Sequence, residues 1–460
     1  MASLPFKTIL TVTTLGVFLT LPTVVPSLAN YKTLDWNDAQ RVLDFIPRAT
    51  TLNPVADEAD RMNPASHAPA AAMGRLLDPQ NNLDHFYAAL RRVEMKEPDA
   101  VVRILHYGDS PTTADLITAD ARSSLQRLFG DAGHGFYLIA KPWAWYGHRG
   151  LESDSEGWKT DPANQSEVRD GLYGLGGVSF RGHAGSWSRI RMRDPGHTRI
   201  EVSFLRQAYG GAFGVWADGS LLGTVDTSGA KAQPGFASFP LRPSTTRLEI
   251  KVTSGDVRLF GVYFEKPAPG LIYSSLGLNG AYVAVPARMF NAAHWIEALR
   301  HYQPDLVIVN YGTNESVYPA FVDQSMVKEV KEVVRRVREA VPGISVLLMS
   351  PMDRAQRGTG GEIATVPVMP RLVSLQEGAA KELGCGFFNT YLAMGGAGTM
   401  AKWYQAEPRL VGGDFIHPMP AGARIVGNLL ETALLDGYNR YKLRLMQPKL
   451  AKAALPERKR

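Results

Sequence analysis

The chain has 460 residues, of which 45% are hydrophobic and 20% are charged, and its net charge is +6. This length is enough for two to three structural units, and the composition excludes wholesale disorder. The single cysteine, Cys385, excludes an internal disulfide and a cysteine-based metal site. Its setting, "GCGFF", predicts a buried strand in which the thiol behaves as a small hydrophobic group.

Residues 1–29 have the layout of a secretory signal peptide. Lys7 precedes an uncharged apolar run, and the segment 27–29 fits a cleavage site for a signal peptidase. Pro22 and Pro26 shorten the apolar helix, which disfavours a full membrane span. An uncleaved membrane anchor is the alternative. Both interpretations predict that the rest of the chain is exported, to the periplasm or the extracellular space, free or tethered to the membrane.

Short apolar strands alternate with helical patterns in two separate parts of the chain. In the first part, a strand at 101–108 is followed by helical spacing over 113–129. In the second part, strands and helices are expected at 304–312, 323–341, 344–351, 371–383 and 384–390, with a closing helix from Pro420. This alternation is typical of an α/β fold, a parallel sheet covered by helices on both faces.

Between these two parts the pattern changes to alternating hydrophobic and polar residues. Runs such as "HTRIEVSFLRQ" and "TTRLEIKVTS", with turns at "ADGS" and "SGD", predict an antiparallel β module inserted into the α/β domain. The predicted organisation is a signal peptide or anchor (1–29), an N-terminal extension with one helix (30–95), the first part of the α/β domain (96–150), the β module (151–268), the second part of the α/β domain (269–437) and a basic tail (438–460).

The predicted tail carries eight Lys or Arg and one Glu. Such a segment could contact an anionic polymer or lipid head groups, but a solvated, frayed end is the preferred interpretation. No nucleic-acid partner is expected.

The stretch "HYGDSPTT" places Ser110 directly after the first predicted strand. Serine followed by Pro111 is a good pair for the cap and first position of a helix, so the local sequence leaves capping and nucleophilic roles open. A Gly-x-Ser-x-Gly elbow is absent from the sequence, which excludes the usual α/β-hydrolase arrangement.

Acyl transfer at a serine requires a base, an acid that orients the base, and hydrogen-bond donors for the oxyanion. Asp414 and His417, three residues apart in "GGDFIHP", offer the acid and the base. Asn314 follows a predicted parallel strand and offers an amide donor, and Gly280 or Gly277 in "SSLGLNGAY" offers a backbone N–H.

The blocks "GDS", "GLNGA", "GTNE" and "DFIH" appear in the order found in SGNH (GDSL-type) hydrolases, which the chain resembles over about 96–150 and 270–437. The resemblance implies a three-layer α/β hydrolase domain that needs no cofactor. It also implies that Ser110 is the nucleophile, His417 the base and Asp414 its orienting acid. The oxyanion hole would consist of the Ser110 and Gly280 N–H groups and the Asn314 side chain.

Within that family the chain is most similar to bacterial peptidoglycan O-acetylesterases. "LQRLFGDAGHGF", "YGTNE" and the inserted module, which in that group resembles carbohydrate-binding jelly-roll β-sandwiches, carry this similarity. Pro111 departs from the group, whose members often carry His or another donor there.

The aromatic segment "KPWAWYGHRG" contains three candidate sugar contacts, Trp143, Trp145 and Tyr146, although packing of the module on its host is the preferred interpretation of such a cluster. The sequence contains no metal-binding motif, so no metal is expected. It indicates no oligomeric state.

The resulting hypothesis is an exported serine esterase that removes O-acyl groups, acetyl foremost, from a cell-envelope polysaccharide. Two alternatives stay open: an O-acyltransferase with the same three residues, and a catalytically weak polysaccharide-binding scaffold.

Overall fold

The computed structural model describes residues 76–453 of the chain, with side chains described for residues 76–446. The predicted signal peptide or anchor (1–29), residues 30–75 of the predicted extension and the last seven residues lie outside the described part. Within the described part, no helix combines the length and the apolar character that crossing a membrane requires.

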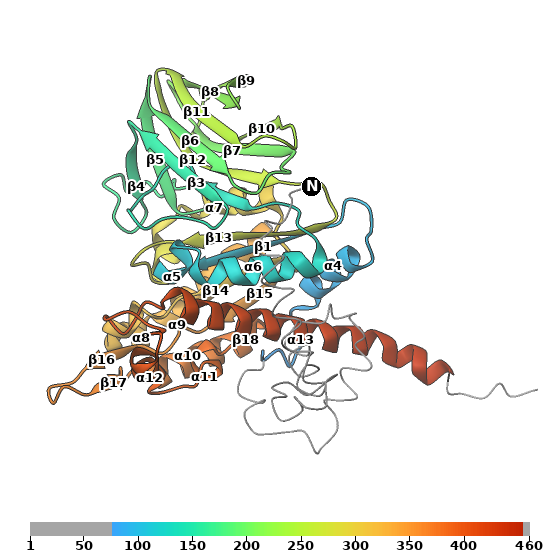
Figure 1. The fold of residues 1–460 in the computed structure, drawn as a ribbon, viewed down its shortest axis with the longest axis vertical. Coiled ribbons are helices and arrows are strands. Elements are labelled where there is room, and N and C mark those ends of the chain that lie inside the picture. Colours follow the sequence, from blue (N-terminus) through green and yellow to red (C-terminus); the bar gives the residue numbers. More distant parts are fainter. Residues whose placement is uncertain (1–75, 454–460) are drawn as a thin grey trace, which may run out of the picture. The chain divides into compact units, whose positions relative to one another are not determined.

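A five-stranded parallel sheet forms the centre of the α/β unit (Figure 1). Its strands are, in spatial order, β13 (Gly270–Gly277), β1 (Val101–Gly108), β14 (Leu306–Asn310), β15 (Ser345–Met349) and β18 (Gly386–Phe388). Adjacent residues of β1 point to opposite faces. The hydroxyl of Tyr107 accepts a hydrogen bond from the Trp295 indole, whereas His106 Nδ1 lies 2.7 Å from the Tyr273 hydroxyl. Both faces of the sheet are therefore buried, as the apolar strands predict.

Helices cover the two faces of this sheet. The helices α7 (Ala292–Tyr302), α9 (Met326–Ala340) and α10 (Met369–Leu383) pack together on the side of Trp295. On the other side α4 (Asp84–Glu94), α6 (Leu116–Phe129) and α13 (Pro420–Ala453) pack together (Figure 1). Shorter elements complete the unit: α5 (Ser110–Thr113), η4 (Val285–Met289), η5 (Glu315–Val317), α8 (Pro319–Gln324), β16 (Ala355–Arg357), β17 (Ile363–Thr365), α11 (Thr390–Ala393) and α12 (Thr399–Gln405).

The inserted β module contains two antiparallel sheets. The strands of the first sheet are, in spatial order, β10 (Gln233–Pro240), β7 (Arg199–Arg206), β12 (Asp256–Glu265), β5 (Val178–His183) and β4 (Lys159–Pro162). The strands of the second sheet are β3 (Leu151–Glu156), β6 (Trp187–Met192), β11 (Arg247–Ser254), β8 (Ala212–Ala217) and β9 (Ser220–Asp226). The rings of Phe204 and Phe213, one from each sheet, meet edge to face with centroids 5.6 Å apart. The predicted α/β fold with an inserted antiparallel β module is thus confirmed.

The module starts earlier in the chain than expected. Strand β2 (Gly135–Leu138), inside the segment assigned to the α/β domain, pairs antiparallel with β12. A four-residue apolar strand fits either sheet, so the sequence pattern alone does not assign it.

The module and the α/β unit share one hydrophobic core. Tyr263 of β12 stacks on Tyr302 of α7 with ring centroids 4.7 Å apart, and the Tyr107 hydroxyl donates to the carbonyl of Leu175 at 3.0 Å. The module is therefore fixed on its host rather than tethered to it.

The expectation that a frayed tail begins at residue 438 is wrong. Helix α13 continues without a break to Ala453, and Tyr438 is fully buried. Lys442 forms an ion pair with Glu94 at 2.8 Å, and Arg444 pairs with Asp84. Lys442 and Arg444 therefore hold α13 against α4.

Candidate active site

The serine lies at the carboxyl edge of the parallel sheet. Strand β1 ends at Gly108, and Ser110 opens the one-turn helix α5. Gly108 permits this sharp turn, because a Cβ there would lie 2.3 Å from the Thr112 Oγ1 atom. The N–H groups of Thr112 and Thr113 both donate to the carbonyl of Asp109, which closes the turn.

Two short hydrogen bonds join Ser110, His417 and Asp414. Ser110 Oγ lies 2.7 Å from His417 Nε2, and His417 Nδ1 lies 2.6 Å from Asp414 Oδ2. An imidazole protonated on Nδ1 donates to the carboxylate and leaves Nε2 free to accept the serine proton. The structure therefore brings together three residues of which the first and last, Ser110 and His417, are 307 positions apart in the sequence.

The loop 412–418 explains why the acid and the base are three residues apart. Asp414 Oδ1 accepts hydrogen bonds from the N–H groups of Ile416 and His417, both at 3.0 Å. Phe415 takes a left-handed conformation with φ of +60°, and the Gly412 N–H donates to the His417 carbonyl. This tight turn directs both side chains to the same point.

The ionisation of Asp414 suits an orienting acid. Partial burial alone would raise the pKa of this carboxyl group. The hydrogen bonds from the His417 side chain and from the two N–H groups outweigh that effect, and the pKa lies below its usual value. Asp414 thus carries its negative charge at neutral pH.

Each of the three donors expected in the oxyanion hole keeps a hydrogen that no protein atom in the described part of the chain accepts. In the described part of the chain, the N–H groups of Ser110 and Gly280 donate to no protein atom. The Asn314 side chain uses one hydrogen of its Nδ2 group for the Ala281 carbonyl at 2.7 Å, which leaves the second hydrogen free. Pro111, which follows the serine, has no N–H to offer.

The sequence leaves Gly280 and Gly277 as alternative donors, and the structure separates them. Gly277 is buried at the end of β13, where a Cβ would lie 2.0 Å from the Thr113 nitrogen. Gly280 is exposed with φ of +69°, and the nearest heavy atom to a Cβ would be 3.9 Å away. Gly277 is a packing position, and Gly280 is the accessible one.

Two buried carboxyl groups, Asp109 and Glu315, support these loops, and sequence reasoning missed Glu315. Asp109 bonds with Thr313, and burial raises its pKa to about 6. Glu315 accepts the Val283 N–H at 2.8 Å, and burial raises its pKa to about 7. Glu315 directly follows Asn314, but a single glutamate in a loop carries no sequence signal of burial.

The structure divides the three candidate sugar contacts. Tyr146 is buried and its hydroxyl accepts the Leu138 N–H, so its assignment as a sugar contact is wrong: it is a packing residue. Trp143 is partly buried against the core, whereas Trp145 is 56% exposed. Arg149, four residues later, donates its N–H to Asp115 at the start of α6.

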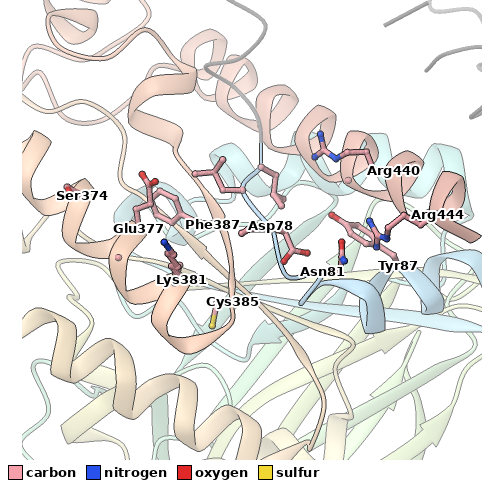
Figure 2. Close-up of a pocket in the computed structure, with 16 residues that line it drawn as sticks. Asp78, Asn81, Tyr87, Ser374, Glu377, Lys381, Cys385, Phe387, Arg440 and Arg444 are labelled. Atoms are coloured by element: carbon pink, nitrogen blue, oxygen red, sulfur yellow. The ribbon is translucent and has the colours of Figure 1, made fainter. Parts of the chain in front are cut away.

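A cavity of about 610 Å³ lies away from these residues, between α4, α10 and α13 (Figure 2). Cations, anions and a tyrosine line it, among them Asp78, Tyr87, Lys381, Arg440 and Arg444. None of the residues around Ser110 contributes to it. In the described part of the chain, no group of His, Cys, Asp or Glu residues is arranged to hold a metal ion.

Comparisons with known proteins agree with this fold. The sequence model of the GDSL-like Lipase/Acylhydrolase family matches residues 258–425, which include Asn314, Asp414 and His417 but not Ser110. No curated protein matches the chain.

Among solved structures, one titled "Peptidoglycan O-acetylesterase in action, 5 min" superposes with a TM-score of 0.67 at 23% identity, covering 79% of this chain and 99% of the other. Two other solved structures are much less similar. One is an acetyl xylan esterase, with a TM-score of 0.27 and 17% identity over 35% of this chain and 80% of the other. The other is a salicylyl-acyltransferase from a tetracycline biosynthetic pathway, with a TM-score of 0.28 and 15% identity over 63% of this chain and 98% of the other. The first likeness establishes a shared fold, and the family match covers the segment that carries Asn314, Asp414 and His417. Over residues 258–425 the sequence is therefore similar to the GDSL-like lipase/acylhydrolase (SGNH) family, and the chain shares its fold with a solved esterase.

Proposed function

We propose that this protein is an exported serine esterase that removes O-acyl groups, acetyl foremost, from a cell-envelope polysaccharide such as peptidoglycan. The observation that carries the proposal is the hydrogen-bonded series Ser110–His417–Asp414. Export rests on the signal-like pattern of residues 1–29 alone.

In the first half of the proposed reaction, Ser110 Oγ attacks the ester carbonyl while His417 Nε2 takes the serine proton. The N–H groups of Ser110 and Gly280 and the Asn314 amide stabilise the tetrahedral oxyanion. His417 then protonates the leaving sugar alcohol, and an acyl-serine remains.

In the second half, water takes the place of the alcohol. His417 removes a proton from the water, which attacks the acyl carbonyl, and the collapse of the second oxyanion returns Ser110 and releases the carboxylic acid. Asp414 keeps the imidazole oriented and stabilises its protonated form throughout.

The exposure of the site favours hydrolysis over acyl transfer. The side chains of His417 and Asp414 are each 46% exposed. Transfer to a sugar hydroxyl requires that water be kept from the acyl-enzyme, and an open site does not exclude it. The assembled residues likewise argue against a purely binding role.

The polysaccharide substrate is the finer part of the proposal. The solved protein that shares this fold over 79% of the chain is named a peptidoglycan O-acetylesterase. O-Acetylated peptidoglycan is therefore the first natural substrate to test.

The deciding experiment compares wild type, Ser110→Ala and the matched control Ser123→Ala. Ser123 lies on α6, where its hydroxyl donates to the Ala119 carbonyl away from the site. Hydrolysis of p-nitrophenyl acetate and acetate release from O-acetylated peptidoglycan are measured. We expect a loss of about 10³-fold or more in Ser110→Ala only. Equal rates in wild type and Ser110→Ala would remove this serine from the reaction.

A further inference from the structure

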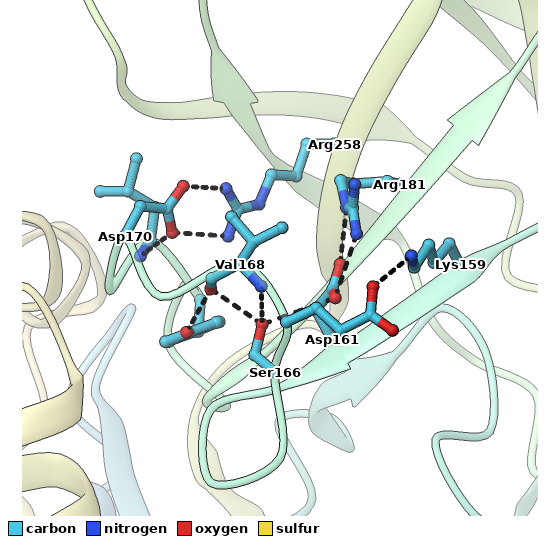
Figure 3. Close-up of polar contacts among 10 residues, drawn as sticks. Lys159, Asp161, Ser166, Val168, Asp170, Arg181 and Arg258 are labelled. Carbon is cyan, nitrogen blue, oxygen red and sulfur yellow. Dashed lines mark hydrogen bonds and ion pairs between the residues drawn. The ribbon is translucent and has the colours of Figure 1, made fainter.

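Two bidentate ion pairs lie at the loop between β4 and β5 of the inserted module (Figure 3). Asp161, almost fully buried, accepts two hydrogen bonds from Arg181 at 2.6 and 3.2 Å. Asp170 accepts two from Arg258 at 2.6 and 3.1 Å. The first pair joins β4 to β5 at the base of the loop, and the second ties the loop itself to β12; bidentate pairs fix direction as well as distance.

This loop reaches across to the α/β unit. Its Asn164 donates from Nδ2 to the carbonyl oxygen of Asn279 at 2.9 Å. The carbonyl of Gly171 accepts the Asn291 N–H at 2.9 Å, and the Gly174 N–H donates to His294 Nε2. The loop is therefore fixed at several points along the segment that follows β13.

The Asn279 carbonyl belongs to the same peptide unit as the Gly280 N–H. This bond is trans, since the cis peptides of the described chain are Ala268–Pro269 and Glu407–Pro408. In a trans unit the C=O and the next N–H lie in one plane and point in opposite directions. A hydrogen bond that holds the carbonyl therefore also aims the N–H, and it polarises the unit so that the N–H becomes a stronger donor.

A second asparagine holds the other side of Gly280. Asn314 donates to the carbonyl of Ala281 at 2.7 Å. The carbonyls on both sides of Gly280 are thus held by asparagine amides, one from the β module and one from the loop after β14. Gly280 needs this restraint, because a glycine at φ +69° has little conformational preference of its own.

The unpaired oxygen of Asn164 points to the same role. Its Oδ1 atom is buried and has no hydrogen-bond partner in the described part of the chain. An unsatisfied buried oxygen costs about 1–3 kcal/mol, so a residue that served packing alone would be expected to be apolar there. What Asn164 supplies is its donor to Asn279.

We infer that Asn164 is a positioning residue of the oxyanion hole, so that the inserted module builds part of the active site rather than only binding the polymer. The inference rests on the proposed function, in which the Gly280 N–H stabilises the oxyanion. Asn164 acts through the Asn279–Gly280 peptide and contacts no reacting atom.

The kinetic test uses Asn164→Ala and Asn164→Asp, which both remove the donor. The control is Lys159→Ala, which removes an exposed ion pair between β4 and Glu167 of the same loop. We expect kcat on p-nitrophenyl acetate to fall about 10-fold in both Asn164 variants, less than the 10²–10³-fold cost of deleting a direct donor. KM should stay within about 2-fold, because the oxyanion forms only after binding. A kcat within about 2-fold of wild type in either folded variant would overturn the inference.

A second readout does not depend on activity. In ¹⁵N-glycine-labelled full-length protein, the Gly280 amide resonance, assigned by its loss in Gly280→Ala, should shift in Asn164→Asp and stay in place in Lys159→Ala. An unmoved resonance in Asn164→Asp would overturn the inference. If wild type and Ser110→Ala show equal hydrolysis, the proposed function fails, and this resonance still decides whether Asn164 holds the Asn279–Gly280 peptide.

Discussion

Gly108 and Gly277 lie opposite each other at the carboxyl ends of the parallel strands β1 and β13. The Leu278 N–H extends this pairing by donating to the Gly108 carbonyl at 3.0 Å. Neither position has room for a side chain, because helix α5 sits directly on the strand ends. The register of these two strands therefore sets the distance between the Ser110 turn and the loop that carries Gly280.

Replacing Gly277 and replacing Gly280, the two glycines of "GLNG", should have unequal effects on stability. Gly277→Ala places a Cβ about where the Thr113 nitrogen lies and should destabilise the fold by about 1–3 kcal/mol or more, with a loss of activity as α5 shifts. Gly280→Ala meets open space and should cost only about 1 kcal/mol, for its left-handed backbone. Urea denaturation of both variants measures this, and equal stability of Gly277→Ala and wild type would contradict it.

The alternation of strands and helices was predictable because buried parallel strands and amphipathic helices leave strong patterns. Helix α9 is an example, with Glu332–Arg335 and Arg335–Glu339 pairs outside and valines inside. The pairing of β2 and the packing of α13 on α4 were not predictable from pattern. Both depend on which distant surface a short or charged segment meets, and local periodicity does not record that.

The orientation of His417 should depend on the charge of Asp414. In Asp414→Asn the Oδ1 atom can still accept the loop N–H groups, but an NH₂ group faces His417 Nδ1 and favours the wrong tautomer. We expect kcat to fall about 10²–10⁴-fold with unchanged thermal stability. Steady-state kinetics and a melting curve test this together. A variant of near wild-type kcat would show that another group orients His417.

The Asn314 amide should matter more to the transition state than to the bound substrate. Asn314→Asp keeps the shape of the side chain but removes both donated hydrogen bonds. We expect kcat to fall about 10²–10³-fold with KM little changed. Asn164 and Asn314 hold the carbonyls of the two residues that flank Gly280. The double variant Asn164→Ala/Asn314→Asp should therefore lose less kcat than the product of the two single fold-losses. Fully multiplicative losses would show that the two asparagines act independently.

The buried carboxyl group of Glu315 should make stability fall as pH rises. Burial raises its pKa from 4.5 to about 7, so between these values the folded state binds more protons than the unfolded state. The stability that wild type has from keeping Glu315 protonated is fully present below about pH 4.5. It is lost as the pH rises through about 7. Glu315→Gln stays neutral and should be more stable than wild type at pH 8, by an amount on the order of 3 kcal/mol, but not at pH 5.

Urea denaturation at the two pH values measures this difference, with the exposed Glu297→Gln as the control. A stability difference between Glu315→Gln and wild type that is the same at pH 5 and pH 8 would contradict the raised pKa.

Of the candidate site, Ser110, Asp414 and His417 could be singled out from sequence because they lie in short, ordered motifs. Their catalytic roles stay a prediction until variants are measured. Asn164 could not be found in this way. It lies in an irregular loop of a different module, and only the folded chain brings it to Asn279.

The part of α13 after residue 437 should contribute to the stability of the fold, which a solvated, frayed tail would not do. The Tyr438 ring is fully buried beside Tyr87 of α4, and its hydroxyl donates to Glu94. Tyr438→Ala should destabilise the protein by about 3–5 kcal/mol, and Tyr438→Phe, which loses only the hydrogen bond, by about 1.5–3 kcal/mol. Arg444→Ala, which removes a partly exposed ion pair with Asp84, should cost about 1 kcal/mol or less. Urea denaturation of the three variants ranks them, and an unaffected Tyr438→Ala would mean that the segment after 437 does not pack on α4 in solution.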